Sequence, residues 1–212
     1  MRKLALSLAL MGMTLIASAQ DIQLPKPQFE NKVTLMEALQ NRHSSREYSE
    51  KQITDSELST VLWAACGINR PESGKLTVPS AINAQDIQVY VIRQDGAYLY
   101  QPKENTLKKV CGKDLRSLVA GRQTFAATTP VSLVLVSNHT KFGNLQKAAE
   151  RLGVIDAGYV SQNICLACAA LGLNTVPRMT MNTEGLRKEL GLDNNYDIII
   201  NSQVGYPKSS EK

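Results

Sequence analysis

Apolar and polar positions alternate in patterns that divide the chain into helices and strands. A Thr-x-x-Glu capping box, typical of helix starts, occurs at Thr34–Glu37 and again at Thr54–Glu57. The first predicts a helix through about Gln40. The second predicts a helix with apolar residues at helical spacing, which Gly67 ends.

Strand-like runs follow in the middle of the chain, at "IQVYVIR", "AYLYQP" and "VSLVLVS", with turn residues in "QDGAY" and "KENTL". Further helices are predicted at "KDLRSLVA", "NLQKAAERL", "IDAGYVSQNICLACAALGL" and "TEGLRKELGL", and a last buried strand at "YDIIINSQVGYP". Helices on both sides of a run of strands, without regular βαβ alternation, favour an α+β layered domain over a doubly wound sheet. No G-x-G-x-x-G dinucleotide motif follows a strand.

The predicted helix from Ile155 to Leu173 carries small or apolar residues on nearly every side. Such a helix is buried all round. One chain of this size can scarcely cover it, so part of it is expected to pack against a second subunit. The alternative is a deep core helix of a monomer.

The first twenty residues have the pattern of an export signal. Arg2 and Lys3 precede an apolar run that closes with Ala17-Ser18-Ala19, a site for signal peptidase. A transmembrane anchor is the alternative, but the run is shorter than the roughly 20 residues that a bilayer requires. We therefore expect a signal peptide at 1–20, one domain at 21–212, no membrane span after cleavage, and a periplasmic or secreted protein.

Charge and cysteine content narrow the function classes. The net charge of +5 includes two positive charges of the signal and is scattered, which argues against nucleic acid but permits an anionic small ligand. The four cysteines lie in apolar surroundings and are expected in the core. The "CLAC" pair falls in mid-helix, not at a helix start, which disfavours a redox role. With two histidines and no carboxylates clustered around them, no metal site is expected.

The densest group of donors is "RHSSREY", residues 42–48. If this segment is extended, Arg42, Ser44 and Arg46 lie on one side. Two guanidinium forks and a hydroxyl suit a terminal phosphate. The alternative is a surface turn whose arginines pair with Glu47 or Glu50.

Three further features complete a candidate ligand site. The loop before the first long strand groups hydroxyl and amide side chains that could read a planar heterocycle, although it could equally be an ordinary turn. Its residues are Pro79, Ser80, Asn83 and Gln85. Gln123 precedes a buried strand, and Lys208 follows the last one. Together, the arginines of residues 42–48, the loop at 79–85, Gln123 and Lys208 would fit a flavin mononucleotide (FMN).

Along almost the whole mature chain, the sequence resembles the FMN-dependent nitroreductase superfamily. Five motifs carry the resemblance, in this order: "RHSSREYSEKQITDSELSTVLWAACGINRP", "PSAINAQDIQVYVI", "GAYLYQP", "GRQTFAATTPVSLVLV" and "DAGYVSQNICLACAALGL". The "PSA" loop and "GAYLYQP" look like the branch that includes azoline-forming-peptide dehydrogenases. The resemblance implies a mostly antiparallel central sheet flanked by helices, an intertwined homodimer, and two FMN molecules at its interface.

The resemblance also implies roles for individual residues. The phosphate and ribityl chain would be held by Arg42, His43, Ser44, Arg46 and Lys208. The flavin ring would be approached from the partner subunit by Pro79, Ser80, Ala81, Asn83 and Gln85, at its polar edge by Gln123, and near its reactive nitrogen by Pro177, Met179 and Thr180. Many members carry Glu-Gly where this chain has Met179-Thr180, so only backbone contact is expected there.

The implied activity is ping-pong hydride or electron transfer through bound flavin to a small planar acceptor, and no acid, base or nucleophile is assigned. Nitroaromatics, quinones and an azoline ring all fit. NADPH or NADH would be the donor, but export makes a membrane or protein electron carrier a competitor. An exported, non-catalytic flavin-binding or flavin-scavenging protein is the alternative function. A domain that binds another anion without flavin is a third.

Overall fold

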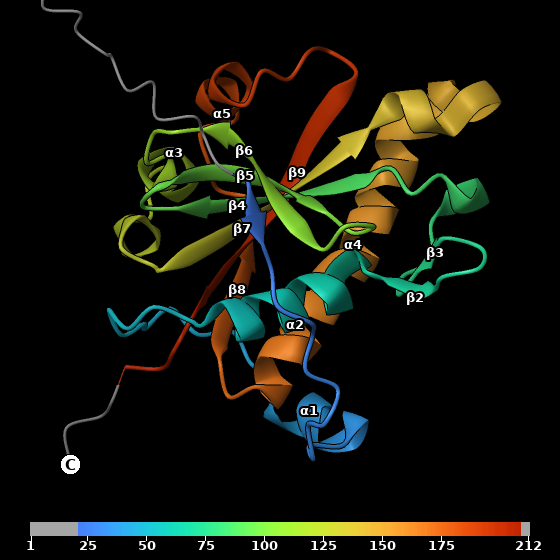
Figure 1. The fold of residues 1–212 in the computed structure, drawn as a ribbon. Helices are drawn as coiled ribbons and strands as arrows, with labels where there is room; N and C mark the ends of the chain where they lie inside the picture. The colour runs from blue at the N-terminus through green and yellow to red at the C-terminus, as the bar shows by residue number, and fades with distance from the viewer. Residues whose placement is uncertain (1–20, 209–212) are drawn as a thin grey trace, which may run out of the picture.

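The computed structural model describes residues 21–208, and the predicted signal peptide lies outside them. A seven-stranded sheet forms the centre of the domain, in the order β1-β6-β5-β4-β7-β9-β8 (Figure 1). Every neighbouring pair of these strands is antiparallel. The strands are β1 (Ile22–Gln23), β4 (Ile87–Arg93), β5 (Gly96–Gln101), β6 (Thr106–Cys111), β7 (Val131–Asn138), β8 (Asn174–Arg178) and β9 (Tyr196–Gly205).

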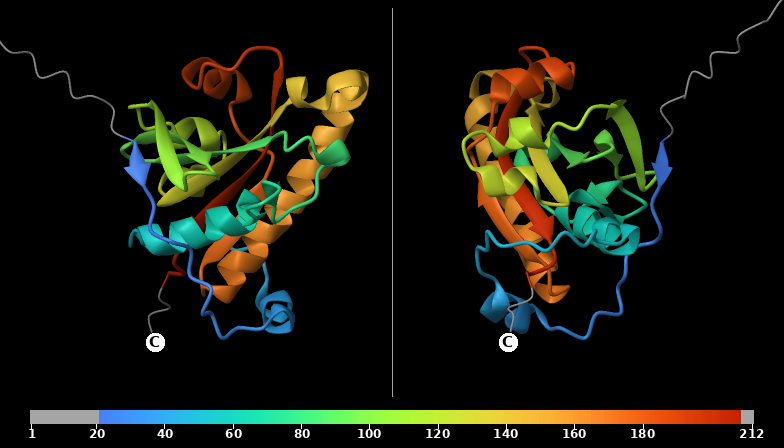
Figure 2. Two further views of the ribbon diagram at one scale, coloured as in Figure 1. Left: turned by 45° about the vertical axis from the view of Figure 1, so that its right-hand side comes forward. Right: turned by 90° about the vertical axis from the view of Figure 1, so that its left-hand side faces the viewer.

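Both faces of the sheet are covered, so its central strands are apolar on both sides. Along β7, Leu133 and Leu135 face one core and Val134 and Val136 the other. The helices α2 (Asp55–Cys66) and α4 (Ala149–Ala170) cover the first face, and α3 (Arg116–Ala120) and α5 (Thr183–Glu189) the second (Figures 1 and 2). The expected α+β fold with a mostly antiparallel sheet is confirmed.

Both predicted capping boxes are present. In α2, the Thr54 hydroxyl accepts from the Glu57 amide at 3.2 Å, and the Glu57 carboxylate accepts from the Thr54 amide at 2.8 Å. Gly67 caps the end of α2 as predicted. The same box opens α1 (Leu35–Asn41), a short helix whose single buried residue is Ala38.

This chain buries the long helix α4 on one side only, and the other side is the part that the sequence analysis expects a second subunit to cover. Val154, Ile155 and Tyr159 are about half exposed, at 52%, 45% and 46%. The opposite side packs against α2 and β9. The helical segment 139–170 is long and apolar enough to span a membrane, but core helices of soluble proteins have the same properties.

Several elements differ from the predictions. β6 was not predicted: its first two residues fell in the expected turn "KENTL", and the consecutive Lys108 and Lys109 interrupt its apolar pattern. β8 was not predicted because Pro177 interrupts it, although proline is tolerated in a strand at the end of a sheet. Residues 144–148, expected as α-helix, belong to a 3-10 helix, η3 (His139–Ala148). The hairpin of β2 (Ile68–Arg70) and β3 (Lys75–Leu76) and the 3-10 turn η1 (Ala81–Asn83) fall in an expected loop.

The cysteines lie mostly in the core, as expected. Cys66, Cys165 and Cys168 are buried and Cys111 is partly exposed, and all four are free thiols. Burial raises the pKa of Cys66 to about 12, so this thiol stays protonated at neutral pH.

Candidate functional site

The segment 42–48 leaves α1 with an extended backbone at Arg42 and runs along the open edge of β8. Ser44 forms a parallel bridge with Thr175, and the Ser45 amide donates to the Thr175 carbonyl at 3.0 Å. The Asn174 amide donates to the Ser45 hydroxyl and to the Glu47 carbonyl, both at 2.8 Å. These bonds fix the segment, which we call the clamp segment, on the sheet.

Most side chains of the clamp segment are exposed, and Arg42, Ser45 and Tyr48 are partly buried. Ser45 points toward Asn174, whereas Ser44 and Arg46 are exposed and Arg42 is partly exposed. Among residues 21–208, neither arginine has a hydrogen-bond or ion-pair partner, so the alternative pairing with Glu47 or Glu50 is not seen. Both guanidinium groups are available to an anion.

Tyr48 anchors the end of the clamp segment. Its hydroxyl donates to the Ser45 carbonyl at 2.7 Å, its ring stacks on Phe125 with centroids 6.4 Å apart, and its backbone bridges Pro207. Burial raises the pKa of Tyr48, so the phenol remains neutral. The bridge to Pro207 brings Lys208, which is exposed, to the same end of the segment.

Next to the clamp segment, a buried arginine holds Gln123. Arg178, at the end of β8, is 5% exposed, and its Nε donates to Gln123 Oε1 at 2.8 Å. Its guanidinium lies 5.4 Å from the Phe125 ring centroid. Burial lowers the pKa of Arg178, and the nearby charge of Arg46 lowers it further. Gln123 and the clamp segment are thus parts of one positively charged region.

The last residues predicted to line the ring lie at the end of β8 and just after it. Pro177 lies within β8, and Met179 and Thr180 follow it. Met179 is 76% exposed, and it lines with Thr180, Gly121 and Arg122 a surface hollow of about 610 Å³. This hollow adjoins the turn that carries Gln123.

The loop at 79–85 is strained and lies elsewhere. Ile82, Asn83 and Gln85 have φ of 50°, 58° and 49°. Such left-handed conformations cost non-glycine residues roughly 1–2 kcal/mol each and cluster at functional sites. The Ser80 hydroxyl accepts from the Gln85 amide, and the Gln85 side chain donates to the Gly74 carbonyl, so both have structural partners. Asn83 and Pro79 are exposed, and Ala81 is partly exposed.

Two buried carboxyl groups support this loop. Asp156 of α4, 2% exposed, accepts from the Ala81 amide at 2.9 Å and lies beside Asp86, which is fully buried. The Ser137 hydroxyl donates to Asp86 at 2.5 Å. Burial raises the pKa of Asp156 to about 6; the Ala81 amide opposes the rise and Asp86 adds to it. A Cβ on Gly153 would lie 2.4 Å from Ser137 Oγ, so only glycine lets α4 come this close.

The structure therefore brings the predicted residues into two groups. The first comprises Arg42, His43, Ser44, Arg46, Gln123, Pro177, Met179, Thr180 and Lys208. His43 is exposed, with its Nδ1 2.8 Å from the Asn41 carbonyl oxygen. The second comprises Pro79, Ser80, Ala81, Asn83 and Gln85. The two groups lie at opposite halves of α4. Ala81 of the second group donates to Asp156. Arg42 of the first group lies near Cys165: burial raises the pKa of this thiol, and the charge of Arg42 offsets part of the rise.

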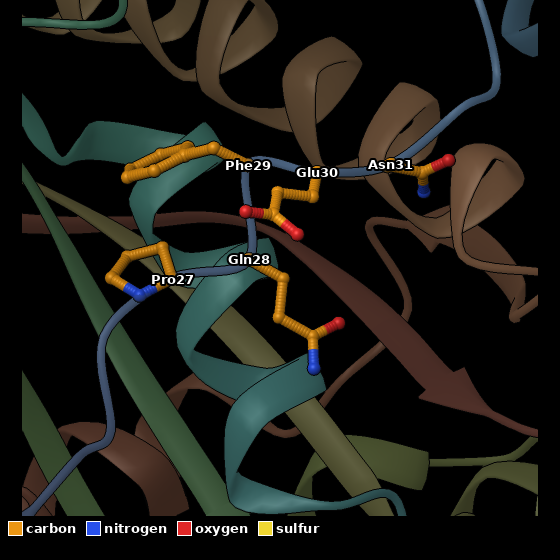
Figure 3. Close-up of a pocket in the computed structure, with 5 residues that line it drawn as sticks. All are labelled: Pro27, Gln28, Phe29, Glu30 and Asn31. Atoms are coloured by element: carbon orange, nitrogen blue, oxygen red, sulfur yellow. The ribbon is translucent and has the colours of Figure 1, made fainter.

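A further hollow lies away from both groups. The arm that leads from β1 to α1 lines a hollow of about 470 Å³ with Pro27, Gln28, Phe29, Glu30 and Asn31 (Figure 3). Gln28 donates to Ser56 at 2.8 Å, and the Phe29 ring meets Trp63 edge-on at 4.7 Å. None of the predicted ligand residues lines this hollow.

Sequence reasoning missed four residues that build these groups: Asn174, Arg178, Asp86 and Asp156. Asp86 and Asp156 stand within the quoted motifs, but no role was assigned to either, and Asn174 and Arg178 lie outside those motifs. A charged residue inside a predicted buried helix, as Asp156 is, was the one signal that could have been read.

Comparison with known proteins assigns the chain to a family. The nitroreductase family matches residues 39–206. A provisionally named nitroreductase of Methanocaldococcus jannaschii is 30% identical over 171 residues, which cover 76% of this chain and 84% of that protein.

Solved structures agree with this assignment. The crystal structure of a provisionally named nitroreductase of Ralstonia eutropha has a TM-score of 0.83 at 33% identity and covers 90% of each chain. One from Desulfovibrio desulfuricans, solved in complex with FMN, has a TM-score of 0.60 at 21% identity, with 84% of this chain and 91% of that chain covered. The chain belongs to the nitroreductase family.

Proposed function

We propose that this protein is an exported, FMN-dependent oxidoreductase that works as a homodimer and passes electrons to a small planar acceptor. The observation that carries the proposal is the clamp segment, in a chain of the nitroreductase family. Its two arginines have no hydrogen-bond or ion-pair partner in the part of the chain that the structure describes, and the segment is fixed on the sheet beside Gln123. FMN bound to the Desulfovibrio desulfuricans structure supports the same cofactor.

The residues present fit FMN at its charged end. A phosphate monoester carries up to two negative charges, and Arg42 and Arg46 offer two guanidinium forks with Ser44 between them. Lys208 adds a third positive charge at the end of the segment. Such charge-assisted bonds contribute roughly 1.5–3 kcal/mol each where they are shielded from water.

The residues also fit the ring end. Pro177 lies in β8, and Met179 and Thr180 follow the last residue of β8, Arg178. Gln123 accepts a hydrogen bond from Arg178, so it lies at the same end of the strand. Flavin, when bound, supplies the electron transfer itself. The protein's part is to bind the phosphate, orient the ring and exclude water from it, so no acid, base or nucleophile is assigned.

The separation of the two residue groups supports a dimer. Asp156 and Cys165 lie nine positions apart along α4, which is roughly 13 Å at about 1.5 Å per residue. If two α4 helices pack antiparallel about a two-fold axis, the loop of one chain lies beside the clamp segment of the other. The exposed apolar side of α4, with Val154, Ile155 and Tyr159, is the surface that such a partner would cover.

Purified protein comprising residues 21–212 tests this function. We expect yellow protein, and we expect the dithionite-reduced protein to be reoxidised by a nitroaromatic or a quinone faster than free FMN at the same concentration. Reduction by NADPH would identify the donor as nicotinamide. Yellow protein that no acceptor reoxidises faster than free FMN would instead indicate a flavin-binding or flavin-scavenging protein. Colourless protein without an FMN-dependent thermal shift would rule out flavin.

A further inference from the structure

Arg178 is a buried cation without a buried counter-charge. Its hydrogen-bond partners are all neutral: the amide oxygens of Gln123 and Asn201, and the backbone carbonyls of Val119, Ala120 and Thr180. None of the ion pairs found among residues 21–208 includes it. Its positive charge therefore acts on whatever occupies the neighbouring surface.

The arginine also fixes which end of Gln123 faces outward. A guanidinium donates only, so the Gln123 amide must turn its oxygen toward Arg178 Nε. The amide nitrogen Nε2 is then directed away, and it has no hydrogen-bond partner among the described residues. Gln123 presents an NH2 donor to a ligand.

Buried neighbours hold this arrangement in place. Asn201 and Gln203 are fully buried, and Gln203 donates to Asn201 Oδ1 at 2.8 Å, the same oxygen that accepts from Arg178 at 3.2 Å. Ser132 in turn donates to Gln203 Oε1 at 2.7 Å. The Asn201 and Gln203 amides each have one allowed orientation, because the oxygen of each accepts from a neighbour and the nitrogen of each donates to another.

We propose that Arg178 is a positioning residue that tunes the flavin: it aims the Gln123 NH2 group at the ring and favours the reduced, more electron-rich flavin over the oxidised one. This inference rests on the proposed function. A fixed donor and a buried positive charge both stabilise negative charge that develops on a neighbouring ligand, and both act strongly where water is excluded.

A purely structural role predicts something else. Arg178 also holds the carbonyls at the end of α3, so its loss would destabilise the fold whatever the ligand. Only the tuning role predicts a change in the reduction potential of bound flavin.

The experiment measures the two-electron midpoint potential of FMN bound to protein of residues 21–212, at saturating FMN. In Gln123→Glu the carboxylate pairs with Arg178, which cancels the charge and removes the outward donor in a side chain of nearly equal size. We expect at least a tenfold loss of preference for reduced flavin, a fall in potential of about 30 mV. Arg178→Met should lower the potential in the same way.

Two variants serve as controls. Arg178→Lys keeps the charge but loses the fork, so it should shift the potential less than Arg178→Met. Arg187→Met removes another arginine that binds backbone carbonyls, those of Asp193 and Tyr196, and should leave the potential unchanged.

The outcomes separate the two proposals. Wild-type protein that binds no FMN would end the proposed function, and this inference with it. If the midpoint potential of bound flavin is the same in wild type, in Gln123→Glu and in any folded Arg178 variant, this inference is overturned while the proposed function stands. Gln123→Glu keeps the test decisive if Arg178→Met fails to fold.

Discussion

Replacing Asp156 by Asn should make the stability of the protein less dependent on pH. Asp156 and Asp86 are buried side by side, with no cation among their hydrogen-bond partners. The pocket that both line contains one other titratable group, the Cys66 thiol. In Asp156→Asn, the amide oxygen can still accept from Ala81, and the amide nitrogen can donate to Asp86.

The sign follows from the raised pKa. Asp156 titrates at about 6 in the folded protein against 3.8 for an ordinary carboxyl, so the folded state holds the proton more tightly. Its stabilising contribution is complete below the unfolded pKa and is lost as pH rises through the folded one. Between pH 4.5 and pH 8 this loss amounts to roughly 2 kcal/mol.

Urea unfolding followed by the fluorescence of Trp63, the single tryptophan, measures the effect. The free energy of unfolding is compared between wild type and Asp156→Asn at pH 4.5 and at pH 8, which cancels the titration of all other groups. From pH 4.5 to pH 8, the free energy of unfolding of the variant should rise relative to that of the wild type by roughly 2 kcal/mol. The slope of the unfolding transition should not change.

A matched control carries the opposite pKa shift. Arg116 holds the pKa of Asp114 below its usual range, so that carboxyl stays ionised from pH 4.5 to pH 8. Asp114→Asn should therefore change stability almost equally at both values. If Asp156→Asn behaves like Asp114→Asn, the folded protein does not hold the Asp156 proton more tightly than the unfolded chain and the reasoning fails.

Three further predictions test other parts of the structure. Ile155→Glu places a charge on the exposed side of α4, so size-exclusion chromatography with light scattering should find folded monomer; a stable dimer would count against this surface as the interface. Tyr48→Phe removes the bond to the Ser45 carbonyl that holds the clamp segment, and should weaken FMN binding severalfold in a fluorescence titration while the melting temperature falls little. An unchanged dissociation constant would refute that role. Thr54→Ala removes the cap of α2 and should cost about 1 kcal/mol of stability by urea unfolding; no loss would mean that the cap is redundant.

The sequence predicted those elements that local rules determine. Capping boxes marked α1 and α2, and the apolar runs of β4, β7 and β9 marked strands that are buried on both faces. β8 escaped because its pairing with β9 and with the clamp segment, not its own composition, makes it a strand. The apolar residues all round α4 indicated that one chain cannot cover it, but which of them stay exposed depends on neighbours that the sequence does not show.

The candidate site was predictable in composition but not in geometry. The sequence singled out Arg42, Ser44 and Arg46, which are exposed or partly exposed, but the two-residue alternation it assumed does not separate them from His43 and Glu47, which are exposed as well. That Arg178 would be buried behind Gln123, and that Asp156 would lie beside Asp86, depends on contacts between residues 55 and 70 positions apart in the chain. No local pattern contains that information.

The stoichiometry and affinity of FMN binding in wild type and in the double variant Arg42→Ala/Arg46→Ala test the central claim most directly. Because neither guanidinium group has a hydrogen-bond or ion-pair partner within residues 21–208, the variant should fold and melt nearly as the wild type does. We predict one FMN per chain in the wild type and a loss of at least a hundredfold in affinity in the variant. Equal flavin occupancy in the two proteins would contradict the assignment of the clamp segment as the phosphate site.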